Sequence, residues 1–363
     1  MTSRALVPGA LLCVTLLAGC TPTSPETTPT SHPTSTATTS ATATATPVAE
    51  ASAPTPRFAL TCSDLGLPAA GTFTSAVTPR DPIALYAGAV GSLPRLTPIQ
   101  AMGGLLCEVS NGVPHATVVG SAPGYAGVLL SILPRATDQW SRYAATYGIA
   151  GTRGFFCNDS TCTGDELVGE YWLSAAGDGV ADSVALDSYL AAIATMIAAL
   201  PASTPAWTPP ATTIPLGSTC ADIVSNAAVS AAAGVSVMAL SGGGGWSAWA
   251  AARAELSAAS CFWGVEGTEH GPGSLSSIPG GDWAARSYLL IATVPTAPVS
   301  ISLVGLGAGD TASLRCSSTQ CFLDLVAGGN WIQIAIDEGP DTPSGAENTA
   351  RAIAEAVLAQ LYS

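Results

Sequence analysis

A pair of cysteines followed by a tryptophan occurs twice in this chain, and this repeat constrains the fold more than any other feature. The first occurrence is Cys157-Asn-Asp-Ser-Thr-Cys162 and the second is Cys316-Ser-Ser-Thr-Gln-Cys321. The matched positions, each separated by 159 residues (316 minus 157 for the first), are Cys157 and Cys316, Cys162 and Cys321, Trp172 and Trp331, and Asp165 and Asp324. Because chance rarely places four matches in one register, the sequence predicts two copies of one domain.

The two predicted copies cover residues 58–202 and 216–363. Each copy opens with a Thr-Cys-x-Asp sequence, which begins at Thr61 in the first and at Thr219 in the second. Each closes with apolar residues at steps of three and four, which predict one buried face of a helix. Residues 203–215 between the copies are rich in proline and predict a stiff linker.

Short apolar runs bounded by turn residues predict strands in the middle of each copy. The predicted strands cover residues 116–119, 127–132, 167–173, 288–294, 322–326 and 331–336. Further helices are predicted at Asp81–Gly91, Asp138–Tyr147 and Trp246–Ser257, and Ser344 with Glu347 predicts a capping box for the last helix. Strands followed by a terminal helix are typical of the α+β class, so each copy is predicted to be a mostly antiparallel sheet packed by helices.

Each predicted copy contains four cysteines, and an even set in an exported chain indicates disulfides. Because the Cys-x4-Cys spacing is the same in both copies, each of these pairs is predicted to close locally across a hairpin. The remaining cysteines then pair as Cys62 with Cys107 and Cys220 with Cys261. The alternatives are a zinc site, which lacks a nearby histidine, and a redox-active pair, which lacks the Cys-x-x-Cys spacing.

The N-terminus has the pattern of an export signal. Residues 5–17 form an apolar run that is too short to cross a bilayer and is typical of a signal peptide. The run ends in Leu17-Ala18-Gly19-Cys20, which resembles the lipobox of bacterial lipoproteins. This resemblance implies removal of residues 1–19 and attachment of fatty acyl chains to Cys20, and two or more chains anchor a protein stably to a membrane. An ordinary secretory signal with an incidental cysteine is the alternative.

Residues 20–57 are dominated by threonine, proline, serine and alanine and contain no aromatic residue. Such a composition cannot bury a hydrophobic core and predicts a disordered segment. Frequent proline favours an extended backbone, so this segment is predicted to be a stalk between the membrane and the folded copies. His32 lies in the stalk and is predicted to have no catalytic role.

The charge balance excludes several classes of function. The chain contains no lysine, which excludes a catalytic lysine and a phosphate-loop lysine. The formal net charge is -14 at pH 7, and such a surface repels nucleic acid and anionic lipid headgroups. Nucleic acid is therefore not a predicted partner, and no cofactor is predicted.

Few residues suggest catalysis or ligand binding, and each has a simpler interpretation. His115 and His270 lie at non-matching positions of the two copies, so neither is predicted to be catalytic. The glycine run 242–245 lacks a following lysine and is predicted to be a flexible loop. Trp172 and Trp331 are predicted to be core or sheet-face residues, and a ligand platform is the alternative.

Two acidic groups are candidate metal sites. Glu266 and Glu269 lie beside His270, and a solvated loop is the favoured interpretation. The run Asp337-Glu338-Gly-Pro-Asp341 has the oxygen ligands that Ca²⁺ takes but lacks the regular spacing of a calcium loop. No metal site is therefore predicted.

The second copy resembles a known family. Thr219-Cys220 and Cys261-Phe-Trp263 look like the Cys…Cys-x-Trp pattern of actinobacterial lipoproteins of unknown function. Gly305-Leu306-Gly307, followed by a strand pair and a closing helix, is similar to that family and to the extracellular sensor domain of PknH-type kinases. The first copy departs from this pattern, with Cys107-Glu-Val109 and with Gly148-Ile-Ala-Gly151 in place of Gly-Leu-Gly. The resemblance covers most of residues 216–363 and implies an exported sensing or binding module.

The sequence therefore predicts a non-catalytic binding or sensor-like lipoprotein on the extracytoplasmic face of a bacterial cell membrane. Its expected partners are the membrane, through the lipid on Cys20, and an envelope ligand or protein that the sequence does not identify. A cell-wall hydrolase that uses Asp165 and Asp324 is the alternative. A lipid carrier is a further alternative, and it requires a large apolar cavity.

Overall fold

The structure of the chain is a computed structural model. The structure describes residues 53–80, 82, 93–113, 123–158, 161–204, 207–241, 246–265, 271–291 and 296–363. The predicted signal peptide, nearly all of the predicted stalk, the predicted strand 116–119 and nearly all of the predicted helix Asp81–Gly91 lie outside these residues.

The first half of the described chain contains one antiparallel sheet. Its strands are β1 Thr78–Arg80, β2 Leu105–Ser110, β3 Gly127–Leu133, β4 Arg153–Asn158, β5 Thr161–Val168 and β6 Tyr171–Asp178. They lie in the order β1-β2-β3-β6-β5-β4, and every neighbouring pair is antiparallel. β1 and β4 are therefore the edge strands of this sheet.

The second half contains a second antiparallel sheet with the same connectivity. Its strands are β7 Val237–Ser241, β8 Ser260–Val265, β9 Gly273–Ile278, β10 Val299–Ser300, β11 Thr311–Cys316, β12 Gln320–Ala327 and β13 Asn330–Asp337. The order is β10-β11-β12-β13-β9-β8-β7, with antiparallel neighbours throughout. From β7 to β11 it repeats the chain order of β1 to β4 in the first sheet, and β10 is an added edge strand. The predicted α+β class is confirmed.

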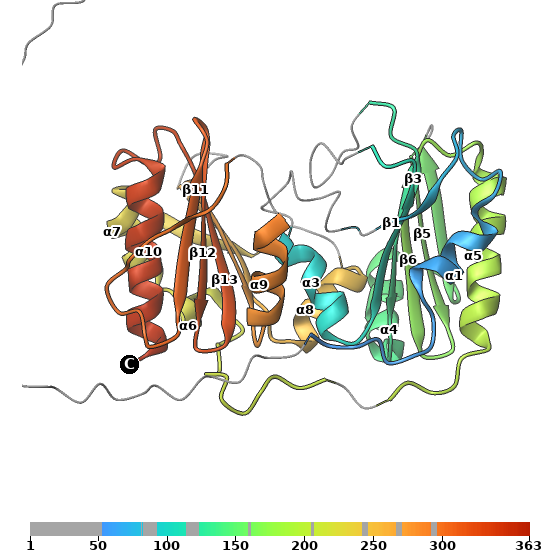
Figure 1. The fold of residues 1–363 in the computed structure, drawn as a ribbon, viewed down its shortest axis with the longest axis horizontal. Helices are drawn as coiled ribbons and strands as arrows, with labels where there is room; N and C mark the ends of the chain where they lie inside the picture. Colours follow the sequence, from blue (N-terminus) through green and yellow to red (C-terminus); the bar gives the residue numbers. More distant parts are fainter. Residues whose placement is uncertain are drawn as a thin grey trace, which may run out of the picture. The chain divides into compact units, whose positions relative to one another are not determined.

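A long C-terminal helix covers one face of each sheet (Figure 1). The helices are α1 Cys62–Gly66, α3 Leu93–Ala101, α4 Thr137–Tyr147, α5 Ser183–Ala198, α6 Cys220–Ile223, α7 Asn226–Ala233, α8 Ala248–Glu255, α9 Asp282–Ile291 and α10 Ala346–Leu361, with a short 3₁₀ turn η1 Leu67–Ala69. α5 buries Leu186, Leu190 and Ile193 against the first sheet. α10 buries Ile353, Val357 and Leu358 against the second, as the helical spacing predicts.

The predicted strand at residues 288–294 is wrong, because Tyr288 to Ile291 belong to α9. A short apolar run fits a buried helix as well as a strand, and the residues before it decide between them. Asp282 lies in the first turn of α9 and pairs with Arg286 four residues later at 3.0 Å, which supports the helix.

The predicted strand 167–173 is also wrong, because it is interrupted by a turn. β5 ends at Val168 and β6 begins at Tyr171. Gly169 between them has φ 62°, a left-handed conformation that glycine adopts without steric cost. The single apolar run in the sequence is therefore two strands of one hairpin.

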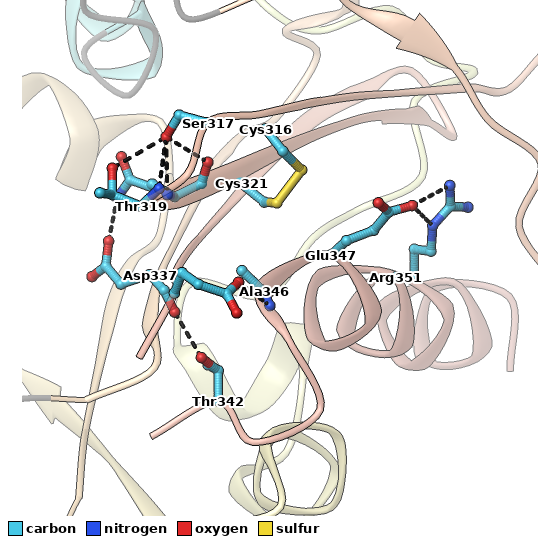
Figure 2. Close-up of a disulfide and its surroundings, with 11 residues drawn as sticks. Cys316, Ser317, Thr319, Cys321, Asp337, Thr342, Ala346, Glu347 and Arg351 are labelled. Carbon is cyan, nitrogen blue, oxygen red and sulfur yellow. Dashed lines mark hydrogen bonds and ion pairs between the residues drawn. A yellow bond between two sulfur atoms is a disulfide. The ribbon is translucent and has the colours of Figure 1, made fainter. Parts of the chain in front are cut away.

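The capping box predicted from Ser344 and Glu347 is not formed. The residue that precedes α10 is Gly345, and it provides no side-chain cap. Instead, the Ala346 N–H donates to a carboxylate oxygen of Glu338 at 2.8 Å. Glu347 pairs with Arg351 within the helix at 2.9 Å, as Figure 2 shows. The cap therefore comes from a residue eight positions earlier, which a local sequence pattern does not reveal.

The other faces of the two sheets are covered by helices that contact both halves. α3 contacts β2 and β3 of its own half and also β9 of the second sheet. α8, which precedes β8 as α3 precedes β2, contacts β3 and β6 of the first sheet. The N–H of the Trp246 indole, just before α8, donates to the Gln139 carbonyl in α4 at 2.9 Å. The packing of the two halves is thus reciprocal.

Two apolar clusters in this region combine residues of both halves. One places Leu96 and Leu106 with Trp283 and Tyr288. The other places Trp140, Trp172, Leu133 and Ile99 of the first half with Ala248, Ala251 and Ala252 of the second. Because both clusters mix side chains of the two halves, the apolar surface buried in them stabilises the contact between the halves.

Candidate functional site

All eight cysteines of the two halves are bonded in the pairs that the sequence predicts. The bonded pairs are Cys62–Cys107, Cys157–Cys162, Cys220–Cys261 and Cys316–Cys321, with Cα–Cα distances of 5.4, 4.0, 5.6 and 4.1 Å. The two short bridges join directly opposite residues of neighbouring strands. The bonded sulfurs provide no thiolate ligands for the zinc site that was the alternative.

The Cys316–Cys321 bridge holds a tight turn together with Ser317 (Figure 2). The Ser317 hydroxyl accepts from the N–H groups of Thr319 and Gln320 at 3.1 and 3.0 Å. The Ser317 N–H donates to the Gln320 carbonyl at 2.8 Å. The Gln320 side chain then donates to Asp337 at 2.6 Å, which links this turn to the end of β13.

The matched aspartates are hydrogen-bond acceptors for the matched tryptophans. Asp324 is 1% exposed and accepts from the Trp331 indole at 3.0 Å and from Gln333 at 2.8 Å. The guanidinium of Arg315 lies 3.5 Å from its other oxygen. Burial raises the pKa of the Asp324 carboxyl, and the charge of Arg315 is the largest opposing influence. This carboxylate is enclosed by the protein.

Asp165 has the same tryptophan contact but different neighbours. Its oxygens accept from the Trp172 indole at 2.8 Å and from the Tyr143 hydroxyl at 2.9 Å. Burial raises the pKa of Asp165, with hydrogen bonds from Ser174, Trp172 and Tyr143 acting in the opposite direction. The side chains of Trp172 and Trp331 are fully buried, so they are core residues, as the sequence predicts, and neither is a ligand platform.

A groove of about 840 Å³ lies at one end of the second sheet. Its floor is apolar, and Met238, Leu240 and Phe262 on β7 and β8 are each 46% exposed. Leu240 lies directly opposite Phe262, and Met238 lies opposite Gly264. A Cβ added at position 264 would lie 2.9 Å from Cδ1 of Leu240, so a side chain there would displace the end of Leu240 from its place on the floor. Glycine at this position therefore keeps the floor open.

The rim of the groove is acidic. Asp337, Glu338 and Asp341 line it, next to the turn that the Cys316–Cys321 bridge closes. Glu338 is engaged with the N-terminus of α10, and Asp337 accepts from Gln320. Burial at the groove raises the pKa of Asp337, and the hydrogen bond from Gln320 opposes this increase. The arrangement can hold an apolar group on the floor and a cationic group at the rim.

The acidic residues of the rim stand out in the sequence, whereas the apolar residues of the floor do not. The acidic run was considered only as a calcium loop, and within the described ranges no three His, Cys, Asp or Glu side chains gather as metal ligands. Met238 and Leu240 are separated by one residue, and residues at this spacing lie on the same face of a strand. This spacing is the one signal in the sequence that the two side chains share a face. The sequence does not indicate that their strand is an edge strand.

Several predicted candidates fall outside the described residues. They are the lipidation site Cys20, the histidines His32, His115 and His270, the acidic pair Glu266 and Glu269, and the glycine run 242–245. Across the part of the chain that the structure describes, no helix combines the length and apolar character that crossing a membrane requires.

Comparison with known proteins adds no assignment. No family model, no curated protein and no solved structure matches this chain.

Proposed function

We propose that this chain is a non-catalytic binding lipoprotein on the extracytoplasmic face of a bacterial cell membrane, and that its ligand binds in the groove on the second sheet. The observation that carries the proposal is the apolar floor, where three large side chains are each 46% exposed beside one another. Exposed apolar residues gathered in a groove with a few polar groups are typical of binding sites.

The anchor and the compartment are parts of the same proposal. Cys20 would carry the lipid, and residues 20–57 would separate the folded part from the membrane. Four disulfides support an oxidising compartment, because such bonds are rare in proteins of the reducing cytosol.

We further propose that the two halves are diverged copies of one domain. Three features support a duplication: the shared strand order, the equivalent disulfides, and the capping boxes that begin at Thr61 and Thr219. The matched contacts of Asp165 with Trp172 and of Asp324 with Trp331 are a fourth. The resemblance of the second copy to actinobacterial lipoproteins and to the sensor domain of PknH-type kinases belongs to the proposed binding role and not to the duplication, because the first copy departs from that pattern.

Binding is favoured over the two alternatives. A hydrolase needs a carboxylate that reaches its substrate, whereas Asp324 is enclosed by Trp331, Gln333 and Arg315. A lipid carrier needs an apolar cavity that shields a whole acyl chain, whereas the groove has exposed floor residues and an acidic rim.

Native mass spectrometry of the full chain, extracted in a mild nonionic detergent, tests the proposal. The wild-type chain is expected to carry a bound species, or to take one up from an envelope extract. The double variant Leu240→Asp with Phe262→Asp is expected to lose it, because two carboxylates on the floor repel an apolar group. Val184→Asp, at an exposed apolar position of the first half, is the matched control. A bound mass that the double variant retains, or no bound mass in any sample, would contradict the proposal.

The anchor is tested separately. In cell fractions, Cys20→Ala is expected to remove the chain from the membrane and to abolish the mass of the lipid on the N-terminal peptide. A variant that stays in the membrane fraction without the lipid would contradict the proposed anchor.

A further inference from the structure

β7, which carries Met238 and Leu240 of the groove floor, is an edge strand. In the described part of the chain β7 has a single strand neighbour, β8, and Ala239 lies opposite Trp263. The Val237 N–H donates to the Ser230 hydroxyl at 3.0 Å, so it points away from β8. Because backbone groups alternate in direction along an antiparallel strand, the N–H and C=O of Ala239 point to the same outer side.

The equivalent edge of the first half is closed by a proline. Pro79 lies opposite Val109, two residues after Cys107, just as Ala239 lies opposite Trp263, two residues after Cys261. Proline has no N–H to donate, and within a sheet it is confined to positions where that group would face away from the ladder. Pro79 therefore supports the outward direction of the Ala239 N–H and also blocks strand addition in the first half.

The side chains that flank Pro79 on β1 and Ala239 on β7 also differ, and again only the edge of the first half is protected against strand addition. Thr78 and Arg80 flank Pro79, and the Arg80 guanidinium donates to the Ser110 carbonyl at 3.1 Å. Met238 and Leu240 flank Ala239 and lie half exposed on the groove floor. Proline and charged residues are the usual protection of an edge strand against pairing with another chain. The first half has this protection at its edge, whereas β7 has neither of these residue types.

We propose that β7 binds an extended, basic segment of another polypeptide, which adds as a strand at the open edge and places its side chains in the groove. This inference rests on the proposed function, because it names the class of ligand for that site. Backbone hydrogen bonds to β7 would supply affinity, and the groove would select alternate side chains.

Charge complementarity selects a basic occupant. Asp337, Glu338 and Asp341 line the rim, and the chain has a formal net charge of -14 with no lysine. A cationic segment is attracted by this field, whereas a second copy of the same acidic chain is repelled. Because successive side chains of a strand point to opposite faces, only every second residue of the segment would reach the groove. An apolar residue at one of these positions and a basic residue at the next would meet the floor and the rim together.

Fluorescence anisotropy with the full chain in nonionic detergent tests the inference. The probe is a short labelled peptide with the repeat Val-Val-Arg-Arg, which presents valine and arginine in turn on each face of a strand. The control peptide has the same sequence with alternate backbone amides N-methylated, which keeps its charge and side chains but removes strand pairing. We expect the N-methylated peptide to bind about tenfold more weakly or worse, because it loses backbone hydrogen bonds.

A pair of proline substitutions forms the matched test on the protein. Ala239→Pro gives β7 the residue that the first half has at this place, and it is expected to weaken the peptide by about tenfold or more. Pro79→Ala is the control and is expected to leave the affinity unchanged, because Arg80 and Thr78 still flank that edge. Asp341→Asn, which leaves the backbone intact, is expected to weaken binding and to reduce its dependence on salt. Far-ultraviolet circular dichroism checks that each variant is folded.

The outcomes separate the inference from the proposed function. If both peptides bind equally and Ala239→Pro has no effect, strand addition is wrong, although the groove still binds cationic amphiphiles. If the wild-type chain binds neither peptide, the inference is wrong, and native mass spectrometry decides the proposed function independently. Weaker binding of the methylated peptide, together with loss of affinity in Ala239→Pro only, supports the inference.

Discussion

A buried carboxylate accepts a hydrogen bond from a tryptophan indole in each half, but only one of the two carboxylates has a cation beside it. Asp324 lies 3.5 Å from the Arg315 guanidinium, and both side chains are fully buried. The position that matches Arg315 in the first half is Phe156, which is 67% exposed, and Asp165 contacts the Tyr143 hydroxyl instead. The two sites therefore respond differently to the same substitution.

Asp324→Asn is expected to destabilise the chain by about 3–5 kcal/mol, because it removes the carboxylate that faces a buried guanidinium. Urea denaturation measures the change in the free energy of unfolding. A loss below about 1 kcal/mol would show that the Arg315 charge is compensated by other groups.

Asp165→Asn is expected to leave the free energy of unfolding unchanged at low pH and to raise it at neutral pH. Burial raises the pKa of the folded Asp165 carboxyl, so the folded chain holds this proton more tightly than the unfolded chain does. That contribution to stability is present below the unfolded pKa of about 4 and is lost as the pH rises through the raised value. Asparagine does not titrate, so the excess stability of the variant should grow above about pH 4. Urea denaturation at a series of pH values measures it, and a constant difference across the series would contradict the assignment.

At the residue scale, the sequence predicted the matched pairs but not what surrounds them. The offset of 159 residues (324 minus 165) identifies Asp165 and Asp324 as equivalent. Arg315 and Tyr143 have no matching counterpart at that offset, and their contacts with the aspartates depend on strand register and helix placement. Met238 and Leu240 were missed for the same reason, because exposure at an edge depends on which strands pair.

At the scale of elements, each half is held by one long and one short disulfide loop. The cysteines are 41 residues apart in Cys220–Cys261 and 5 apart in Cys316–Cys321. In the chain-entropy model a longer closed loop restricts the unfolded chain more strongly. The two bridges should therefore contribute unequally to stability, although they lie in one half.

Replacing both cysteines of a bridge by serine tests this difference. Loss of Cys220–Cys261 is expected to cost about 4 kcal/mol, and loss of Cys316–Cys321 about 2 kcal/mol. Thermal unfolding of the two double variants measures the costs side by side. Equal costs would mean that local packing, and not loop length, sets the contribution of these bridges.

Hairpins were predictable and α9 was not, for physical reasons. β12 contains an apolar run, and apolar residues alternate with others along β13. Gly328 and Gly329 lie between the two strands, and their φ values of 56° and 81° suit a tight turn. Residues 288–291 are not flanked by a glycine turn of this kind. A buried apolar run is compatible with either a strand or a helix. The cap from Glu338 on α10 likewise depends on a loop that returns to the helix start.

At the scale of the whole molecule, the sequence predicted two copies and a linker but not the contact between them. α3 and α8 mix apolar residues with polar ones such as Arg95 and Arg253, and the sequence gives no sign that each helix packs on the opposite sheet. The linker itself is packed, since the Ile214 N–H donates to the Gly328 carbonyl at 2.8 Å and Trp207 joins an apolar cluster.

The shared clusters predict that both halves unfold in one cooperative transition. Ala251→Arg places a charge among buried residues of both halves and is expected to split the calorimetric transition into two, with the first at a lower temperature. Ala254→Arg on the exposed side of the same helix is the matched control and should leave one transition. Two transitions in the wild-type chain would contradict the expectation.

α3 packs on the second sheet and α8 packs on the first. This exchange of helices determines whether the protein stays together when its chain is cleaved. A protease that cleaves once between α5 and α6 leaves each fragment with a helix lodged on the sheet of the other. Separating the fragments would break up the apolar clusters that contain Leu96, Trp140 and Trp283, and none of the four disulfides between described cysteines crosses the cut. The nicked protein should therefore migrate as one particle on a sizing column and as two bands in denaturing gels, and the two pieces, produced separately, should reassemble.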